Sequence, residues 1–349
     1  MIEFPALGLQ FNINPVALQV GPITVYWYGV IIAFGFMLAV FLAMRASKGY
    51  GVDPENIIDL VLFAAPVSII FARLYYVVFK WEDYRSDLSE IYKIWHGGIA
   101  IYGAVIGALL SAWLFARYKK ISPLNLFDLG VPYLILAQAI GRWGNFVNQE
   151  AFGVNTALPW GMTSNRIRSE LGNLQAQGMN VDPSLPVHPT FLYESLWNLA
   201  AFFALIYFSK RRKVEGEVFF LYMILYGAGR FWIEGLRTDS LMLGNFRISQ
   251  VLALVLAVVF AVIFFVRRKK LREQSEEAGV VRGTSEYGEV LKQLNENEAE
   301  NEAVNTSEAA DEASEAAEKD PSAEEEPETA NNEEKNETNQ AEPNEEVKQ

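Results

Sequence analysis

The segment 141–153 reads GRWGNFVNQEAFG and places an arginine, two asparagines and a glutamate directly after the apolar run VPYLILAQAI. The guanidinium group of Arg142 is planar and binds phosphate through paired hydrogen bonds. Asn145, Asn148 and Glu150 can bind hydroxyl groups or position the arginine. Alternatively, Asn145 and Asn148 only cap the end of a helix. The segment therefore favours binding of an anionic ligand that also carries hydroxyl groups.

Ionisable residues also occur inside other apolar segments, as Arg73, Arg230 and Glu234. Charges within a membrane span are costly, so they mark either a functional site or a structural pair. Arg230 and Glu234 are four residues apart on one helical face, and a salt bridge that makes the helix insertable would explain them both. Arg73 and Arg142 lack such a nearby acid. Several arginines at the depth of lipid headgroups indicate a phospholipid anion as the ligand.

The apolar segments themselves predict the fold. Stretches near the length that crosses a bilayer occur seven times, at about residues 25–44, 57–78, 99–116, 126–140, 192–208, 218–233 and 248–266. The sequence therefore predicts an all-α integral membrane protein, with seven transmembrane helices in a domain of residues 1–272.

Basic residues in short loops predict the orientation, because they accumulate on the cytoplasmic side. Clusters follow the first, third, fifth and seventh segments, at residues 45–48, 117–120, 210–213 and 267–270. All four lie on one side if the N-terminus is outside and the C-terminal tail is cytoplasmic. Arg73, Arg142 and Arg230 then lie in the later parts of outward-running spans, so the polar groups gather toward the outer leaflet.

Two tyrosines begin inward-running spans and should lie at the same depth. Tyr28, in the run YWYG, is also explained as part of an interfacial aromatic belt. Tyr102 lies on a glycine-rich face that helix packing alone would explain. His96 is expected to be solvated. The segment from His188 to Glu194 is as consistent with a capped helix start as with a binding site.

The loops and termini add little chemistry. Residues 144–190 are polar, contain four prolines, and include SNRIRSELGNLQAQG, which predicts a short surface helix. We expect this connection to form a small external head. From residue 273 onward, 25 acidic and 5 basic residues occur with few aromatics, which predicts a disordered cytoplasmic tail over 273–349. The absence of cysteine excludes disulfides and thiolate metal ligands, and two distant histidines make a zinc site unexpected.

Segment 141–153 matches the pattern G-R-x-G-N-F-x-N-x-E-x-x-G at every fixed position. This pattern is the signature of bacterial prolipoprotein diacylglyceryl transferases, and the chain resembles that family over residues 15–270. Further matches are W-Y-G at 27–29, the glycine pair 97–98, H-P-x-x-L-Y-E at 188–194 and Y-G-x-x-R-x-x-x-E at 226–234.

The resemblance implies an enzyme of the bacterial plasma membrane. Such an enzyme moves an sn-1,2-diacylglyceryl group from phosphatidylglycerol to the lipobox cysteine of a prolipoprotein, and it releases glycerol phosphate. Its expected partners are these two substrates and membrane lipids, with no nucleic acid, metal or organic cofactor. By motif position, Arg142 and Arg230 resemble the family's essential headgroup arginines. The other positions that the family requires correspond to Tyr28, Asn145, Glu150, Gly153 and Glu234.

We expect Arg73, Asn148 and Tyr226 to complete the phosphatidylglycerol site. Tyr102 occupies the place where some members of the family carry a histidine proposed as the base, so its hydroxyl is a candidate for proton transfer. The chemistry suits arginines, because a phosphate ester leaves with growing negative charge while a thiolate attacks. The alternative is a transporter or lipid-binding protein for an anionic substrate. Transporters often contain inverted repeats and charges near the midplane, and the sequence shows neither.

Overall fold

The computed structural model describes residues 1–238, 242–243 and 246–277. Contacts divide the chain into two units, residues 1–273 and 274–349. The tail predicted for residues 273–349 therefore lies almost entirely outside the described residues.

Long helices dominate the described residues, and each overlaps one predicted span. They are α1 (Trp27–Ser47), α2 (Pro54–Phe79), α4 (Ile101–Tyr118), α5 (Pro123–Asn148), α7 (Thr190–Ser209), α8 (Glu217–Glu234) and α9 (Ile248–Glu277). Six of these described helices are long and apolar enough to cross a membrane. The exception is α8, whose 18 residues include Glu217, Arg230 and Glu234. A mostly helical, multi-pass membrane protein is confirmed, whereas the seventh span remains a prediction.

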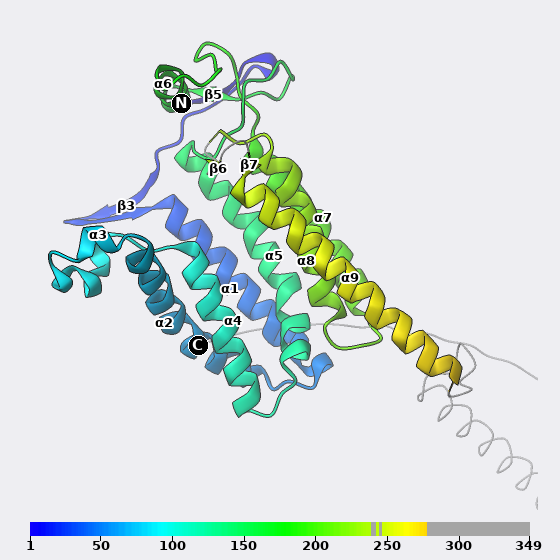
Figure 1. Cartoon of the computed structure of the whole chain (residues 1–349). Coiled ribbons are helices and arrows are strands. Elements are labelled where there is room, and N and C mark those ends of the chain that lie inside the picture. The colour runs from blue at the N-terminus through cyan, green and yellow to red at the C-terminus, as the bar shows by residue number, and fades with distance from the viewer. Residues whose placement is uncertain (239–241, 244–245, 278–349) are drawn as a thin grey trace, which may run out of the picture. The chain divides into compact units, whose positions relative to one another are not determined.

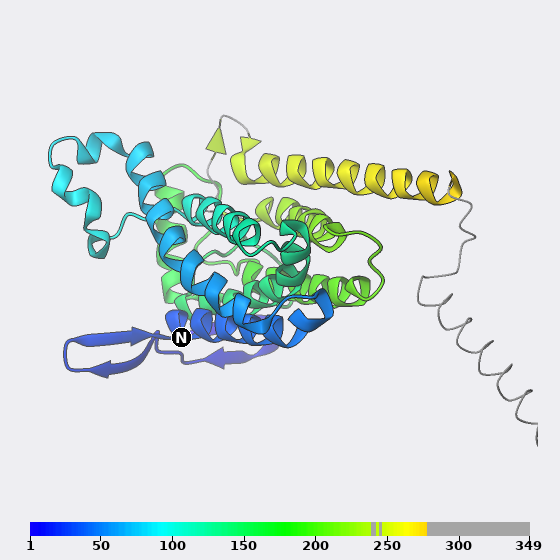
Figure 2. The same ribbon diagram turned by 90° about the horizontal axis from the view of Figure 1, so that it is seen from below.

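Helix α5 is the centre of the bundle. It packs against α1, α7 and α8, while α2 and α4 form a pair beside α1 (Figure 1). Seen from below, α9, drawn in yellow, lies at the edge of the bundle (Figure 2). It touches α8 where a Cβ added to Gly227 would lie 2.7 Å from the Ala253 carbonyl oxygen. The central position of α5 means that its side chains can meet groups from several helices.

The prediction of an all-α fold is wrong in one respect, because the described residues include short strands. These are β1 (Ile2–Phe4), β2 (Leu9–Phe11), β3 (Val16–Val20), β4 (Ile23–Tyr26), β5 (Thr163–Ser164), β6 (Met242–Leu243) and β7 (Phe246–Arg247). Their lengths of two to five residues are too short for an alternating pattern to stand out. Strand β4 also takes the first residues of the predicted span 25–44, so α1 begins only at Trp27.

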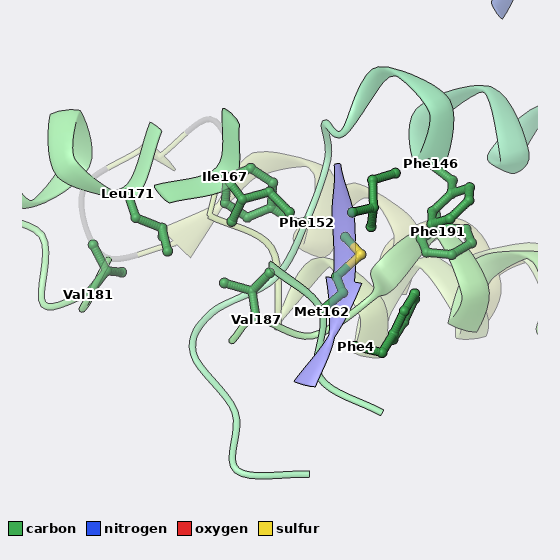
Figure 3. Packing of buried hydrophobic residues seen from close by; sticks show 10 residues of the cluster. Phe4, Phe146, Phe152, Met162, Ile167, Leu171, Val181, Val187 and Phe191 are labelled. Carbon is green, nitrogen blue, oxygen red and sulfur yellow. The ribbon is translucent and has the colours of Figure 1, made fainter. Parts of the chain in front are cut away.

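The N-terminus packs with the polar connection after α5. Strand β1 pairs antiparallel with both β2 and β5, with Ile2 opposite Ser164. Ile2 and Phe4 thereby enter an apolar cluster with residues of the connection and of the neighbouring helix ends (Figure 3), which are Phe146, Phe152, Met162, Ile167, Leu171, Val181, Val187 and Phe191. The predicted head segment 144–190 therefore shares its core with the first residues of the chain.

Shorter elements complete the described fold. The predicted surface helix is confirmed as α6 (Asn165–Ala176), and the Ser164 hydroxyl caps it by accepting from the Ile167 N–H at 3.1 Å. Between α2 and α4 lie α3 (Trp81–Tyr84) and 3₁₀ turns at Leu88–Tyr92 and Ile94–His96. Two further 3₁₀ turns, Pro5–Leu7 and Lys48–Tyr50, follow β1 and α1.

A buried carboxylate fixes the start of α8 against α5. The Asp128 side chain is fully buried and accepts from the N–H groups of Gly216 and Phe219 at 2.7 and 2.8 Å. It also pairs with Arg212 at 3.1 Å. These bonds satisfy N–H groups that a helix start leaves unpaired, and the negative charge suits the helix dipole.

We expect Asp128→Ala to lower the free energy of unfolding by about 3–5 kcal/mol, because the change leaves a partly buried cation and two N–H groups without their acceptor. The matched control is Asp59→Ala, since Asp59 forms an exposed pair with Lys119 at 2.9 Å. An exposed pair contributes about 1 kcal/mol or less. Thermal unfolding in detergent, followed by circular dichroism, measures both variants. Equal midpoints for the two would contradict the role of Asp128.

Candidate active site

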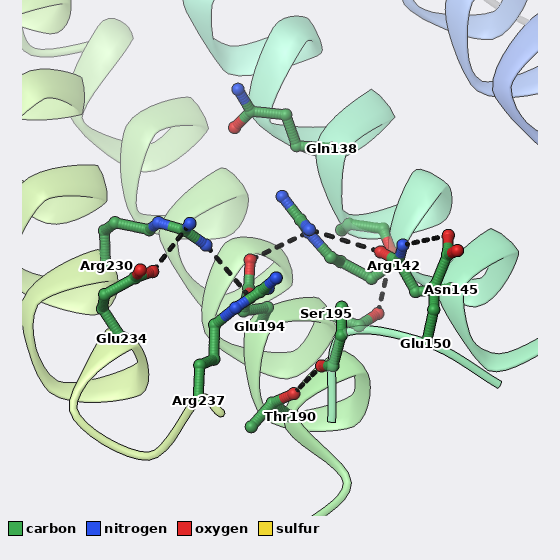
Figure 4. Close-up of polar contacts among 12 residues, drawn as sticks. Gln138, Arg142, Asn145, Glu150, Thr190, Glu194, Ser195, Arg230, Glu234 and Arg237 are labelled. Carbon is green, nitrogen blue, oxygen red and sulfur yellow. Dashed lines mark hydrogen bonds and ion pairs between the residues drawn. The ribbon is translucent and has the colours of Figure 1, made fainter. Parts of the chain in front are cut away.

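A buried carboxylate gathers three arginines where α5 and α8 end and α7 begins (Figure 4). Glu194 of α7 binds Arg142 Nε through Oε2 at 2.9 Å. Its Oε1 atom lies 3.1 Å from Arg237 Nη1 and 3.4 Å from Arg230 Nη1. The Glu194 side chain is only 7% exposed. One carboxylate thus sets the spacing of guanidinium groups from α5, α8 and the turn that follows α8.

Among the described residues, guanidinium groups outnumber carboxylates in this cluster. Glu234 supplies a second carboxylate, with Oε2 at 2.7 Å from Arg230 Nη2. Three guanidinium groups from the described part of the chain therefore contact two carboxylates. The side chains of Arg142 and Arg230 are 24% and 22% exposed, so a ligand can reach them. Within the described residues, Arg142 Nη2 has no protein partner. Partly buried cations in excess favour an anionic ligand.

Helical spacing explains how these groups meet. On α5, Gln138 and Arg142 are four residues apart and Asn145 follows three later, which places all three on one face. On α8, Tyr226, Arg230 and Glu234 follow one another at four-residue steps. Because α5 packs against both α7 and α8, these faces converge on Glu194.

The end of α5 turns a third carboxylate, that of Glu150, back onto the helix. Gln149 takes a left-handed conformation (φ 54°), and the Glu150 N–H bonds the Asn145 carbonyl at 3.1 Å. The Glu150 Oε1 atom then accepts from the side-chain amides of Asn145 at 3.0 Å and Asn148 at 3.3 Å. Arg142 Nη1 donates to Asn145 Oδ1 at 3.3 Å. Both asparagine amides therefore bind Glu150, and a hydrogen-bonded chain links Arg142 to Asn148.

Gly153 sits where three chain segments approach closely. A Cβ atom added there would lie 2.8 Å from His188 Cβ and 3.0 Å from the Leu236 carbonyl oxygen. The Gly153 N–H donates to the His188 carbonyl oxygen at 3.0 Å. No side chain fits without displacing backbone. Gly153 thus holds the loop after α5 between the start of α7 and the turn after α8.

Tyr28 lies beside the Glu150 chain. Its ring packs on Gly144, where an added Cβ would be 2.7 Å from Tyr28 Cδ2. Tyr28 and Asn148 also line a common pocket of about 620 Å³, which Arg166 of α6 borders. The structure therefore brings Tyr28, Asn145, Asn148, Glu150 and Arg142 into one continuous region.

The sequence pattern does not single out two of the side chains near the arginines, Gln138 and Arg237, and it allows either a structural or a functional role for Glu194. Gln138 Nε2 donates to the Tyr222 hydroxyl at 3.2 Å, and its Oε1 atom is buried without a partner in the described residues. Tyr226 stacks on Tyr222 with ring centres 5.7 Å apart. Gln138 is a polar residue in an apolar segment, four residues before Arg142, and this spacing could have indicated that it lies near the site. For Arg237, the sequence shows only that it lies just beyond the sixth predicted span, which does not indicate a role in the site.

A family model described as prolipoprotein diacylglyceryl transferase matches residues 15–266. The chain belongs to the prolipoprotein diacylglyceryl transferase family. A phosphatidylglycerol–prolipoprotein diacylglyceryl transferase from Listeria monocytogenes serotype 4b is 50% identical over 265 residues, which cover 76% of this chain and 93% of the relative. Proteins of the same name from Ligilactobacillus salivarius and Limosilactobacillus reuteri are 47% and 45% identical, and each is covered over 94% of its length. They align with 73% and 75% of this chain.

Arg73 does not join the arginines of this family member's candidate site. Its side chain is buried, and its guanidinium group donates to backbone carbonyls of the loop between α2 and α4. Nη1 bonds the oxygens of Gly97 and Gly98 at 2.5 and 2.7 Å, and Nη2 and Nε bond those of Glu90 and Ile91 at 2.6 and 2.8 Å. Arg73 thus organises the loop.

We expect Arg73→Lys to destabilise the loop by at least about 1.5–3 kcal/mol, because a hydrogen bond to a charged group contributes this much and lysine cannot reach four carbonyls. Activity measured below the unfolding temperature should remain. Limited proteolysis between residues 80 and 98, compared with the thioether-forming rate, separates the two effects. If activity is lost while the proteolysis pattern is unchanged, Arg73 contributes to anion binding and not only to the loop.

Tyr102 is also separate from the arginines. It lies in the first turn of α4, which packs mainly on α2, and its ring centre is 6.2 Å from that of Tyr75. Its hydroxyl has no hydrogen-bond partner among the described residues. The role in proton transfer suggested by the family resemblance therefore remains a prediction.

The two histidines lie in different electrostatic surroundings. Burial lowers the pKa of His188, whose Nδ1 is 3.1 Å from the Tyr193 hydroxyl. His96 was expected to be solvated, and it is half exposed with Nδ1 2.8 Å from Glu90 Oε2. Hydrogen bonds from Lys93 and then His96 lower the pKa of Glu90. Across the described residues, no group of three or more histidine, aspartate or glutamate side chains could hold a metal ion.

Proposed function

We propose that this protein transfers the sn-1,2-diacylglyceryl group from phosphatidylglycerol to the lipobox cysteine of prolipoproteins. Its family and the name of its relatives support this activity. The observation that carries the proposal for the site is the convergence of Arg142, Arg230 and Arg237 on Glu194. Two of these guanidinium groups are partly open to a ligand, as a phosphate-binding site requires.

The reaction is a displacement at the glycerol carbon that carries the phosphate. The thiolate sulfur attacks this carbon, a carbon–sulfur bond forms, and the carbon–oxygen bond to phosphate breaks with its electron pair on oxygen. Glycerol phosphate leaves, and the thiol proton is released. Donors that face the departing oxygen stabilise the developing charge. We assign this role to Arg142 and Arg230, while Glu194 and Glu234 hold the two guanidinium groups apart.

The neighbouring polar groups suit the glycerol headgroup. Glu150 offers a carboxylate that already accepts from two amides, and Asn145 and Asn148 hold it in place. We propose that Glu150 accepts hydrogen bonds from headgroup hydroxyls, with Tyr28 at the side of Asn148. Tyr226 lies one turn before Arg230 on the same face of α8, and we propose that it lines the headgroup site there. Gly153 acts by allowing the close approach of the loops.

An apolar groove beside the arginines suits the acyl chains. The groove lies between α1, α5 and α7 and has a volume of about 470 Å³. Phe34, Leu136 and Leu199 line one end of it, and Trp143 and Ser195 line the other. Trp143 directly follows Arg142 in the chain. A phospholipid whose phosphate contacts Arg142 can therefore place a chain in this groove, and both substrates can enter sideways from the membrane.

We also propose the membrane orientation. The basic residues that follow the first, third, fifth and seventh segments belong to the opposite end of the bundle from Glu194, as the pairs Lys119–Asp59, Arg212–Asp128 and Arg268–Glu217 indicate. With that end cytoplasmic, α8 also crosses the membrane, as the sixth of seven spans in chain order, and the N-terminus is outside. The site then faces the outer leaflet, residues 144–190 form an external head, and the tail is cytoplasmic.

The decisive experiment incubates purified protein with phosphatidylglycerol and a lipobox peptide. We expect a peptide mass increase by one diacylglyceryl group together with an equal amount of glycerol phosphate. A transporter or lipid-binding protein would bind the lipid and yield neither product, which would refute the proposed activity. Replacing the peptide cysteine by serine is the control, because it removes the nucleophilic sulfur.

A further inference from the structure

The hairpin of β3 and β4 extends away from the helices, just before α1 begins. Both views show it projecting from the bundle at the end where α1 starts (Figures 1 and 2). It forms a sheet of its own, with two strands only. An isolated two-stranded hairpin is at best marginally stable in water, so something else is expected to cover it.

The register gives the hairpin one apolar face and one polar face. Leu18 pairs with Val25 and Val20 pairs with Ile23, so these four side chains lie on the same side. Gln19 pairs with Thr24 on the opposite side. Leu18, Val20 and Ile23 are 57%, 61% and 65% exposed in the folded chain. The part of the chain that the structure describes therefore leaves the apolar face uncovered.

The hairpin leads directly into a candidate membrane span. Strand β4 ends at Tyr26 and α1, a candidate membrane span, begins at the next residue. The Trp27 N–H bonds the Pro15 carbonyl at 2.9 Å, which ties the base of the hairpin to the first turn of the helix. Tyr26 and Trp27 are exposed there, as aromatic residues at a membrane interface are.

Composition favours lipid over a protein partner. Residues 4–44 contain no aspartate, glutamate, lysine, arginine or histidine, so nothing charged opposes insertion of the hairpin. A protein-docking surface of this size would be expected to carry a polar rim. We propose that the hairpin lies in the membrane interface, with Leu18, Val20, Ile23 and Val25 inserted among lipids and Gln19 and Thr24 facing water.

This position has a consequence for the pocket beside Tyr28. Val25 and Tyr26 of β4 line that pocket together with Asn148. Insertion of the hairpin sets the pocket at the level of the lipid headgroups. The inference rests on the membrane-spanning fold and on the hairpin register, and it does not depend on the chemistry assigned to the arginines.

The absence of cysteine allows a direct test. Leu18→Cys and Gln19→Cys place a single spin label on opposite faces of β3, one residue apart. The full chain is reconstituted in nanodiscs of phosphatidylglycerol and phosphatidylethanolamine, and power saturation compares collisions with oxygen, which enters lipid, and with a water-soluble nickel chelate. We expect the ratio of oxygen to nickel accessibility to be clearly higher at position 18 than at position 19. Ile23→Cys and Thr24→Cys repeat the comparison on β4.

The other outcomes overturn the proposal. Equal ratios on the two faces, in both pairs of variants, would mean that the hairpin does not insert. A label at position 18 that leaves water only after a lipobox peptide with its signal segment is added would identify a peptide-docking face instead. Circular dichroism and thioether formation by each labelled variant verify that the fold is intact.

Discussion

Replacing Arg142 or Arg230 by alanine is expected to lower kcat/KM for thioether formation by about 100-fold or more, the effect of removing one donor from a charge-stabilising site. Both guanidinium groups contact Glu194 and are partly open to a ligand. Arg142→Lys is expected to fail nearly as badly. A single ammonium group cannot bind Glu194, Asn145 and a phosphate at once in the planar geometry of the guanidinium.

The control for these variants is Arg117→Ala. Arg117 is an exposed arginine at the end of α4 that stacks near Trp113, and it has no ion pair among the described residues. We expect its activity to stay within about twofold of wild type, in keeping with the small effects of surface substitutions. Initial rates in phosphatidylglycerol nanodiscs, with thermal midpoints for each variant, provide the comparison. Wild-type turnover by both alanine variants would show that neither Arg142 nor Arg230 stabilises the transition state.

The meeting of Arg142 and Arg230 could be anticipated from the sequence, because both lie late in spans that run in the same direction. Position along a span predicts the level of a side chain within the bundle. It does not predict the direction in which the side chain points. Arg73 and Tyr102 show this limit. They lie at the corresponding ends of α2 and α4, yet Arg73 bonds loop carbonyls and Tyr102 packs on Tyr75.

Glu194 was ambiguous for a related reason. It lies in the first turns of α7, close to His188 and Pro189, where a polar side chain is equally expected as part of a helix start. Its role follows only from the packing of α7 between α5 and α8, which brings three arginines to it. The same holds for the N-terminus. Strand β1 pairs with β5 about 160 residues later in the chain, and three-residue strands carry too little pattern to predict such a partner.

Glu194→Gln is expected to lower both the stability of the protein and its activity. The carboxylate binds three guanidinium groups and is nearly fully buried. Glutamine keeps the shape but removes the charge, and its amide NH₂ group can only face another donor. Removing one partner from a buried ion pair costs about 3–5 kcal/mol. We expect a clearly lower thermal midpoint and a loss of thioether formation. Glu170→Gln, on the exposed side of α6, is the matched control and should behave as wild type.

An added anion can show whether Glu194 positions the arginines for a phosphate group or only stabilises the fold. Glu194→Gln removes the negative charge that contacts Arg142, Arg230 and Arg237, so a bound anion should compensate part of the missing charge. Glycerol phosphate, the proposed leaving group, is therefore expected to raise the thermal midpoint of Glu194→Gln more than that of the wild type. Glu194→Asp keeps the negative charge, but its side chain is one methylene group shorter and cannot hold the three arginines at the same spacing. We therefore expect this variant to be more stable than Glu194→Gln but to have little activity. If glycerol phosphate shifts both midpoints equally, the arginines held by Glu194 do not form the phosphate site, and the leaving group binds elsewhere.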